Sequence, residues 1–279
     1  MGAVALRGCP APSFDEDNLE SLLNSKIRIG TAGWTVPTHL SSRFEKDGTH
    51  LERYAKTFNA VEINSSFYHQ HKPETYKRWA QCVPSDFKFS VKLNQIFTHD
   101  QRLNVNEAEL TETLEGIREL DDKWSSLLVQ LPPSLIYSPS LSDTFFSQIR
   151  QSYSGPIVLE PRHRSWIKSI PLMKRFGISK VKADPEPVPI EDSEYQHQSV
   201  LYYRLHGSPD LYRSSYSYVT LRYLGLQMQS HLDSTHEIWC IFDNTALSHA
   251  MTNAFELNEI ISELPIPHLQ NLQTEERNL

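Results

Sequence analysis

Eight short apolar or alternating runs, separated by segments of helical periodicity, constrain the fold of this chain more than any other feature. Most runs are rich in the Val, Ile, Phe, Tyr and Leu residues that favour strands. They lie at 27–33, 60–64, 87–93, 126–132, 156–162, 179–185, 200–207 and 237–244. In most gaps, apolar residues recur every three or four positions. This pattern predicts helices over 50–58, 73–83, 107–120, 143–153, 218–232 and 249–264.

Eight strands alternating with helices predict a single parallel eight-stranded (β/α)8 TIM-type barrel, a fold of about 250 residues. A doubly wound open sheet is the main alternative. The sequence contains neither G-x-G-x-x-G nor G-x-x-x-x-G-K-[ST], so nucleotide phosphate loops of those kinds are not expected. We expect an N-terminal arm over 1–26, the barrel over 27–264 and a C-terminal tail over 265–279.

Composition excludes some classes of protein. No apolar run reaches the length of about 18 residues that a transmembrane helix needs, and the N-terminus does not read as a secretory signal, so no membrane partner is expected. Three cysteines without C-x-x-C spacing favour the reducing cytoplasm over a zinc ribbon or a redox motif. A net charge of −7 argues against broad, non-specific binding of nucleic acid.

The alternation of side chains along each run predicts which of them enter the barrel. In 60–64, for example, Val61 and Ile63 pack outward while Glu62 and Asn64 point inward. In 179–185, Val181 and Ala183 are expected outward and Lys182 and Asp184 inward. The inward polar set predicted in this way is Arg28, Glu62, Asn64, Ser90, Lys92, Gln130, Glu160, Lys182, Asp184, Arg204, His206 and Asp243.

These inward charges mark a candidate site, because TIM-barrel active sites lie at the C-terminal ends of the strands. The alternative is a set of interior ion pairs that do no chemistry. We predict catalytic roles for Glu62, Lys92, Glu160, Asp184, His206 and Asp243. We predict substrate contacts for Trp34, Asn64, Tyr68, Gln130, Arg162, Trp166, Arg204, Tyr216 and Asn244.

The chain also resembles a known family. The stretches "GTAGW", "LERYAKTFNAVEINSSFY", "PETYKRWAQCVPSDFKFSVKL", "THDQRL", "LLVQLPPSL", "EPRHRSW", "YYRLHGSP" and "IFDNTA" are similar, in order, to the YecE-like family, domain of unknown function 72. The resemblance spans about residues 27–260, implies a bacterial protein with a TIM-type barrel like that of the endonuclease IV and xylose isomerase group, and implies no established reaction. Its signature positions here are Gly30, Gly33, Trp34, Glu62, Asn64, Phe67, Tyr68, Lys92, His99, Gln130, Pro132, Glu160, Arg162, Trp166, Asp184, Arg204, His206, Gly207, Tyr216, Asn244 and Thr245.

Three functions fit these residues. The first is an enzyme that acts on a small phosphate- or sugar-containing substrate. Lys92, Arg162 and Arg204 would clamp the anion. A carboxylate whose pKa is raised by burial would serve as acid or base, and His206 would move protons near neutral pH.

The second is a metal-dependent hydrolase or isomerase in which Glu160, Asp184, His206 and Asp243 hold a divalent cation. This is not favoured, since one histidine at a strand end is few for a metal site. No cofactor is otherwise indicated. The third is a barrel that binds nucleic acid through Arg162–Arg164 and "THDQRL", with aromatic side chains stacking on the bases. In this interpretation the ligand is a nucleic-acid-derived anion.

Overall fold

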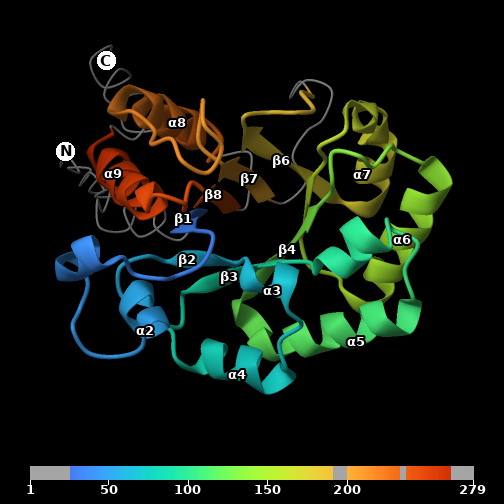
Figure 1. The fold of residues 1–279 in the computed structure, drawn as a ribbon, viewed down its shortest axis with the longest axis horizontal. Helices are drawn as coiled ribbons and strands as arrows, with labels where there is room; N and C mark the ends of the chain where they lie inside the picture. The colour runs from blue at the N-terminus through green and yellow to red at the C-terminus, as the bar shows by residue number, and fades with distance from the viewer. Residues whose placement is uncertain (1–25, 191–199, 233–236, 265–279) are drawn as a thin grey trace, which may run out of the picture.

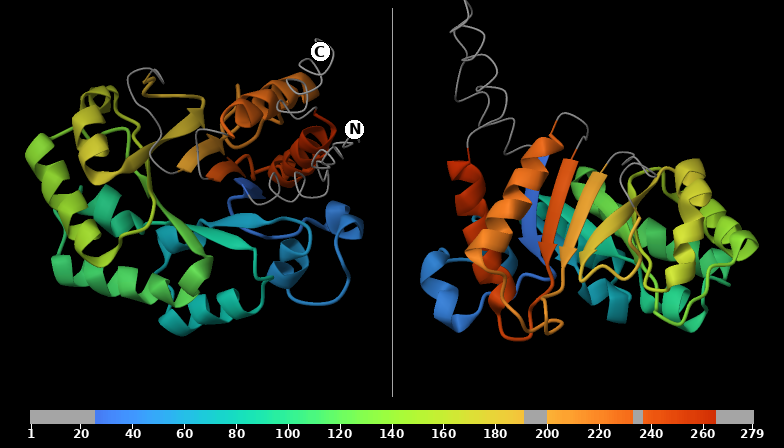
Figure 2. Two further views of the ribbon diagram at one scale, coloured as in Figure 1. Left: turned by 180° about the vertical axis from the view of Figure 1, so that it is seen from behind. Right: turned by 90° about the horizontal axis from the view of Figure 1, so that it is seen from above.

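Eight parallel strands form a barrel in the computed structural model, which describes residues 26–190, 200–232 and 237–264. The strands are β1 (Ile27–Thr31), β2 (Ala60–Ile63), β3 (Lys88–Lys92), β4 (Trp124–Gln130), β5 (Ile157–Glu160), β6 (Ile178–Asp184), β7 (Val200–Leu205) and β8 (Glu237–Phe242). Figure 2 shows β1, β8, β7 and β6 running side by side in one direction. The predicted (β/α)8 TIM-type barrel is confirmed. The predicted tail and all but the last residue of the predicted arm lie outside the described residues.

The barrel closes where β1 meets β2. β1 pairs with β8 along its whole length, whereas β1 and β2 are joined by a bridge between Ala32 and Glu62. The N–H of Gly33 donates to the carbonyl of Glu62 at 2.9 Å. Glycine is required at position 30, because a Cβ there would lie 2.1 Å from the carbonyl oxygen of Ala60.

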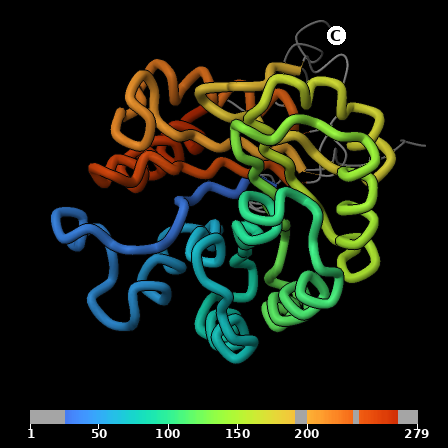
Figure 3. The backbone as a smooth tube through the Cα atoms, turned by 45° about the vertical axis from the view of Figure 1, so that its right-hand side comes forward, coloured from blue at the N-terminus to red at the C-terminus, as the bar shows by residue number. Residues whose placement is uncertain are grey.

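Helices surround the strands (Figure 1). They are α2 (His50–Ala55), α3 (Ser65–Tyr68), α4 (Pro73–Gln81), α5 (Glu107–Ile117), α6 (Pro139–Ser152), α7 (Ile170–Phe176), α8 (Tyr218–Ser230) and α9 (His249–Glu263). Short 3-10 segments occur at η1 (Thr38–Arg43), η3 (Arg118–Lys123) and η4 (Arg164–Ser169), and a π turn at η2 (Ile96–Asp100). The tube in Figure 3 shows α5, α6 and α7 following one another along the green-to-yellow side.

Six of these helices, α2, α4, α5, α6, α8 and α9, overlap the six predicted from periodicity. The pattern missed α3, which has four residues, and α7, which has seven, because both are too short to repeat an apolar spacing. Within the described residues, no helix has both the length and the apolar character needed to cross a membrane.

The buried apolar side chains form two distinct layers inside the fold. The outer layer packs strands against helices and includes Val61, Phe89, Leu159 and Phe242. The inner layer fills the barrel and consists of Ala60, Leu128, Val158, Val181, Ala183, Val200, Tyr202, Trp239 and Ile241. The predicted alternation is therefore confirmed for the strands other than β6.

The alternation predicted for β6 was wrong. Val181 and Ala183 belong to the inner layer, whereas Lys182 lies over the ring of Tyr203, which belongs to the outer one. The outer face of β6 also carries Lys180, whose Nζ donates to Glu186 at 2.6 Å. Because the lysines on this face have polar or aromatic partners, the face does not have to be apolar. Lys182 and Asp184 leave the inward set as a result.

Candidate functional site

Charged side chains from several strands meet inside the barrel at the C-terminal ends of the strands. We call this group the strand-end cluster. Glu62 comes from β2, Lys92 from β3, Glu160 from β5, Arg204 from β7, and Arg162, His206 and Asp243 directly follow or lie just beyond β5, β7 and β8. All are buried or nearly so, since none of their side chains is more than 20% exposed. Every member was predicted as a site residue.

Arg204 is the centre of the cluster. Its Nε and Nη2 donate to the two carboxylate oxygens of Glu62 at 2.9 and 2.8 Å. Nη1 donates to Glu160 Oε2 at 3.1 Å, and Nη2 lies 3.0 Å from Asp243 Oδ2. The side chain is 0% exposed. Nη1 also lies 3.4 Å from His206 Nε2, so the printed contacts of the guanidinium are all internal to the cluster. The predicted contact of Arg204 with a substrate anion stays a prediction.

Glu160 receives hydrogen bonds from three further residues. Arg162 donates to Oε1 through Nε at 3.0 Å and Nη2 at 2.8 Å, and Gln130 donates to Oε2 at 3.0 Å. Burial acts to raise the pKa of Glu160, but Arg204, His206 and Arg162 outweigh it and hold the pKa well below its usual range. Glu160 therefore stays ionised at neutral pH.

His206 lies between two carboxylates. Its Nε2 is 3.0 Å from Glu160 Oε1, and its Nδ1 is 3.0 Å from Asp243 Oδ2. Burial acts to lower the pKa of His206, but the hydrogen bonds to Asp243 and Glu160 prevail and the pKa is raised. For Asp243, burial is likewise outweighed by Arg204 and His206, so its pKa is lowered. A buried carboxyl group that acts as an acid needs a raised pKa, and neither Glu160 nor Asp243 has one, whereas the pKa of His206 is raised above its usual value.

A layer of hydroxyl groups supports the cluster from below. Tyr202 donates to Glu62 Oε2 at 3.1 Å and lies 3.0 Å from Ser90 Oγ, which in turn accepts from Ser126 Oγ at 3.0 Å. The Tyr202 ring is stacked parallel to that of Trp239 at 5.8 Å. These contacts fix Glu62, whose carboxylate would otherwise be held by Arg204 alone.

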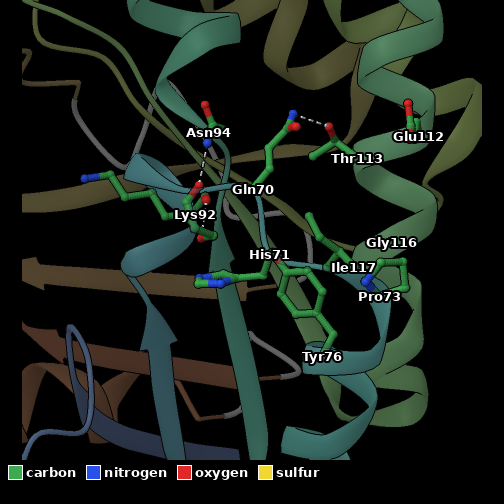
Figure 4. Close-up of a pocket in the computed structure, with 11 residues that line it drawn as sticks. Gln70, His71, Pro73, Tyr76, Lys92, Asn94, Glu112, Thr113, Gly116 and Ile117 are labelled. Atoms are coloured by element: carbon green, nitrogen blue, oxygen red, sulfur yellow. Dashed lines mark hydrogen bonds between the residues drawn. The ribbon is translucent and has the colours of Figure 1, made fainter.

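Lys92 differs from the other cations of the cluster. Its Nζ lies 3.9 Å from the centroid of the Phe67 ring, and within the described residues it has neither a hydrogen bond nor an ion pair. Figure 4 shows the Lys92 side chain extending away from most of the other residues drawn, which line a cavity among α3, α4 and α5. Burial and the charge of Arg204 lower the pKa of Lys92 to about 8, against the opposing effect of Glu62, Asp243 and Glu160.

The described residues enclose two cavities of note near this end of the barrel. One of about 330 Å³ lies between the chain after β1 and the start of α9, lined by Thr31, Ala32, Gly33, Thr35, Pro37, Thr245, Ser248, Ala250 and Met251. Two of its lining residues are linked to the strand-end cluster through the backbone, since Ala32 pairs with Glu62 and Thr245 comes two residues after Asp243. The other, of about 100 Å³, lies among α3, α4 and α5 (Figure 4).

The remaining predicted residues divide into two groups. Asn64 lies at the mouth with a buried Oδ1 that has no partner, and Tyr68 is 59% exposed with its ring edge-on to Phe67. Trp34 is partly buried against Trp79, with ring centroids 5.0 Å apart. Gln130 touches the cluster through Glu160. These residues are near the cluster or at its rim.

Three others do not face it. Trp166 is 0% exposed and donates from Nε1 to the carbonyl of Leu135, so it has no surface for a ligand. Tyr216 accepts the N–H of Gly207 on its hydroxyl and is 7% exposed. Asn244 is fully buried and donates to the carbonyl of Ser214 and to Asn253. In this structure all three side chains are buried and hydrogen-bonded within the protein, and their predicted substrate contacts stay predictions.

Sequence reasoning missed Tyr212. It edges the ring of His206 at 5.7 Å and lies next to Arg162, with 38% of its surface exposed. Its φ of 66° is unusual for a residue with a side chain, and such strain often occurs at functional sites. The alternation rule could not find it, because Tyr212 lies in a loop where no strand geometry applies.

Asp184 is not part of the cluster. It lies on β6, whose alternation is reversed, and its carbonyl accepts the N–H of His206. Among the described residues, no group of three or more His, Cys, Asp or Glu side chains is placed to hold a metal ion. In the cluster itself, the carboxylate oxygens of Glu62 and Glu160 already accept hydrogen bonds from Arg204, Arg162 and Gln130. The predicted metal set Glu160, Asp184, His206 and Asp243 is therefore not assembled.

Comparison with known proteins places the chain in a family. The family model "Protein of unknown function DUF72" matches residues 28–275. UPF0759 protein YecE of Escherichia coli is 32% identical over 106 residues, which cover 38% of each chain. UPF0759 protein YunF of Bacillus subtilis is 25% identical over 148 residues, covering 50% of this chain and 52% of that one. The matched part thus spans about half or less of these curated relatives.

Solved structures agree on the fold. A DUF72 family protein from Enterococcus faecalis superposes with a TM-score of 0.71 at 21% identity, covering 86% of this chain and 96% of that chain. One from Thermotoga maritima gives 0.70 at 21% identity, with 85% and 100% covered. With the family match across nearly the whole described barrel, the chain belongs to the DUF72 family, as its sequence motifs predict.

Proposed function

We propose that this protein is an enzyme that binds a small anionic substrate, carrying a phosphate or a phosphorylated sugar, at the strand-end cluster. The observation that carries the proposal is the unpaired Lys92 beside charges that are otherwise paired. The three carboxylates balance Arg162, Arg204 and Lys92, so a protonated His206 leaves one net positive charge. An anion entering the cluster restores the balance, and a buried charge is stable only when balanced.

General acid–base chemistry in this site would fall to His206. The neighbouring carboxylates remain ionised, because Arg204 keeps the pKa of Glu160 and Asp243 low. They hold the imidazole by both nitrogens and set its pKa. A histidine held in this way gives or takes a proton near neutral pH. Glu160 and Asp243 are, in this proposal, residues that position and tune His206.

The cavity of about 330 Å³ suits the rest of such a substrate. Its lining includes the hydroxyl-bearing residues Thr35, Thr245 and Ser248 and no carboxylate. Hydroxyl groups both donate and accept hydrogen bonds, as sugar hydroxyls and phosphate oxygens require. Its volume is at the lower end of the range for small-molecule sites.

The nucleic-acid alternative has less support. Arg162 turns inward onto Glu160, and His163 accepts the N–H of Ser165 at the start of η4. The basic run 162–164 therefore does not form one continuous phosphate-binding surface. Exposed Tyr68 remains available for stacking. Binding of a single-stranded oligonucleotide that weakens steeply with salt would favour this alternative. We retain the cytoplasm as the proposed compartment, from the scattered cysteines.

The test uses inorganic phosphate and a panel of sugar phosphates, with binding followed by calorimetry. Lys92→Met removes the cation at nearly constant volume. It is expected to weaken binding by about 10- to 150-fold, which corresponds to losing a charge-assisted contact of about 1.5–3 kcal/mol. Lys88→Met is the matched control at the other end of β3, where Lys88 contacts Asp122 instead of the cluster. Equal weakening by both variants, or no binding of any anion by the wild-type protein, would contradict the proposal.

A further inference from the structure

Lys92 is held in an environment that a simple anion-binding lysine does not need. Its charged end lies over the face of the Phe67 ring at 3.9 Å, and the residue is 5% exposed. The strand end that carries it is fixed from behind, because Ser66 Oγ donates to the carbonyl of Lys92 at 2.6 Å. Although Nζ has no hydrogen-bond partner among the described residues, it is not one of the fully buried polar atoms, so it keeps some contact with solvent.

This environment favours the free amine. The ring face attracts an ammonium, but Nζ is removed from water and has no carboxylate in direct contact, so burial outweighs this attraction and lowers the pKa. With a pKa of about 8, roughly 10% of Lys92 is uncharged at pH 7. For an ordinary lysine the fraction is about 300-fold smaller. A neutral amine is a nucleophile, whereas an ammonium is not.

The surroundings also supply a second titratable ring. His99 lies edge-on to Phe67 at 5.0 Å, and its Nδ1 is 2.9 Å from Thr98 Oγ1. Burial and the charge of Lys92 lower the pKa of His99, so its imidazole is neutral at pH 7. Lys92 thus has a neutral imidazole on the Phe67 side. From the barrel side it faces Arg204, Glu62, Asp243 and Glu160, which come from four other strands or strand ends.

We propose that Lys92 is the nucleophile of this site and forms an imine with an aldehyde or ketone carbonyl of the anionic substrate. This rests on the proposed function, whose substrate class it narrows to phosphorylated or carboxylated carbonyl compounds. The lone pair of Nζ forms a bond to the carbonyl carbon while the C=O π electrons move to oxygen, and a proton passes from the nitrogen to that oxygen. The carbinolamine hydroxyl group then takes up one proton from a neighbouring acid and leaves as water. One amine, one carbonyl and one proton give one protonated imine and one water, and no oxidant or reductant is needed.

The carboxylates of the cluster suit the product of this step. A protonated imine carries its positive charge where the ammonium of Lys92 was, so the attraction to Glu62, Asp243 and Glu160 is retained. His206 and His99 are the groups near the cluster that can carry the protons taken up and released. The proposed chemistry therefore leaves the charge balance of the barrel interior unchanged.

The experiment traps the imine by reduction. The full-length protein is incubated with pyruvate, or with glycolaldehyde phosphate, and sodium cyanoborohydride at pH 7, and the adduct is located by peptide mapping. We expect a single reduced adduct on Lys92, formed at least about tenfold faster than on any other lysine, given its larger free-amine fraction. Lys88→Met should label at the wild-type rate, and Lys92→Met should lose the fast labelling.

Phosphate binding, measured separately, distinguishes the two proposals. Lys92→Arg keeps the positive charge but cannot form the imine, so it should bind inorganic phosphate and show no adduct at position 92. If the wild-type protein binds phosphate through Lys92 but is labelled there no faster than on Lys88, the imine is refuted and the anion site stands. If neither phosphate nor either carbonyl probe binds, both proposals fail.

Discussion

Replacement of Arg204 by methionine tests the idea that the barrel interior depends on paired charge. Arg204 is 0% exposed and contacts Glu62, Glu160 and Asp243 at 2.8–3.1 Å. In Arg204→Met, Glu160 keeps Arg162 and Asp243 keeps His206. Glu62 keeps only the hydroxyl of Tyr202 as a hydrogen-bond donor among the described residues.

The expected loss is large. Removing one partner of a buried ion pair costs about 3–5 kcal/mol, because the remaining charge is uncompensated. For a chain of this size, that corresponds to a fall in Tm of about 6–20 °C. Urea unfolding at pH 7, followed by circular dichroism, measures the difference directly. Arg175→Met is the control, because Arg175 pairs with Asp143 at the surface and should cost less than about 1 kcal/mol.

The pH dependence sharpens the test. In the wild-type protein the pKa values of Glu160 and Asp243 are depressed, so their stabilising contribution is fully present at both pH 7 and pH 5 and is lost only at lower pH. In Arg204→Met, burial is no longer opposed by Arg204 and raises these pKa values. As the pH falls toward 5, these carboxylates in the folded variant therefore take up protons. The difference in the free energy of unfolding between the wild-type protein and Arg204→Met then narrows.

A second substitution isolates the charge. Glu62→Gln in the Arg204→Met background removes the least compensated carboxylate, and we expect it to recover at least about 1 kcal/mol. A cost below about 1 kcal/mol for Arg204→Met, or a gap that is the same at pH 5 and pH 7, would refute the reasoning.

Three further predictions follow from single contacts. The pKa of His206 is raised on folding, so its contribution to stability is complete below about pH 6.5 and is lost as the pH rises through the folded value. The Tm of the wild-type protein should therefore fall more between pH 6 and pH 8 than the Tm of His206→Gln. Equal falls in Tm for the two proteins would contradict this. Gly207 has φ +93°, and a Cβ there would lie 3.0 Å from the carbonyl oxygen of Ser214. Gly207→Ala should therefore lower the free energy of unfolding, measured by urea titration, by more than about 1 kcal/mol. An unchanged free energy of unfolding would show that the loop relaxes freely. Trp166→Phe leaves the carbonyl of Leu135 without its donor, so it should cost about 1–3 kcal/mol while phosphate affinity stays within twofold; a large fall in affinity would return Trp166 to the binding site.

Much of the fold could be predicted because the apolar and polar positions along most strands match the outer and inner faces that a barrel gives them. Alternation in runs such as 87–93 separates Phe89 and Val91, which pack against helices, from Ser90 and Lys92, which enter the barrel. The same rule failed in β6, because it assumes that the outer face of every strand is apolar. Whether partners such as Glu186 and Tyr203 compensate lysines on that face depends on the neighbouring chain and not on the strand.

For the site, alternation was enough to collect Glu62, Glu160, Arg204, His206 and Asp243, because strand ends of a parallel barrel converge at one end. It could not assign their roles. Residues in loops were less predictable, since no periodicity relates a loop side chain to the barrel. Trp166 therefore proved to be buried, and Tyr212 was missed.

The sequence by itself determined the eight strand–helix units, the family, and which charges end the strands, because these depend on local patterns of apolar and polar residues. Only the tertiary structure decided how the charges pair. Arg204 is fully occupied and Lys92 is left over the ring of Phe67, although both are inward cations at strand ends. That difference depends on distances between side chains from separate strands, and it sets which cation is left without a carboxylate in direct contact.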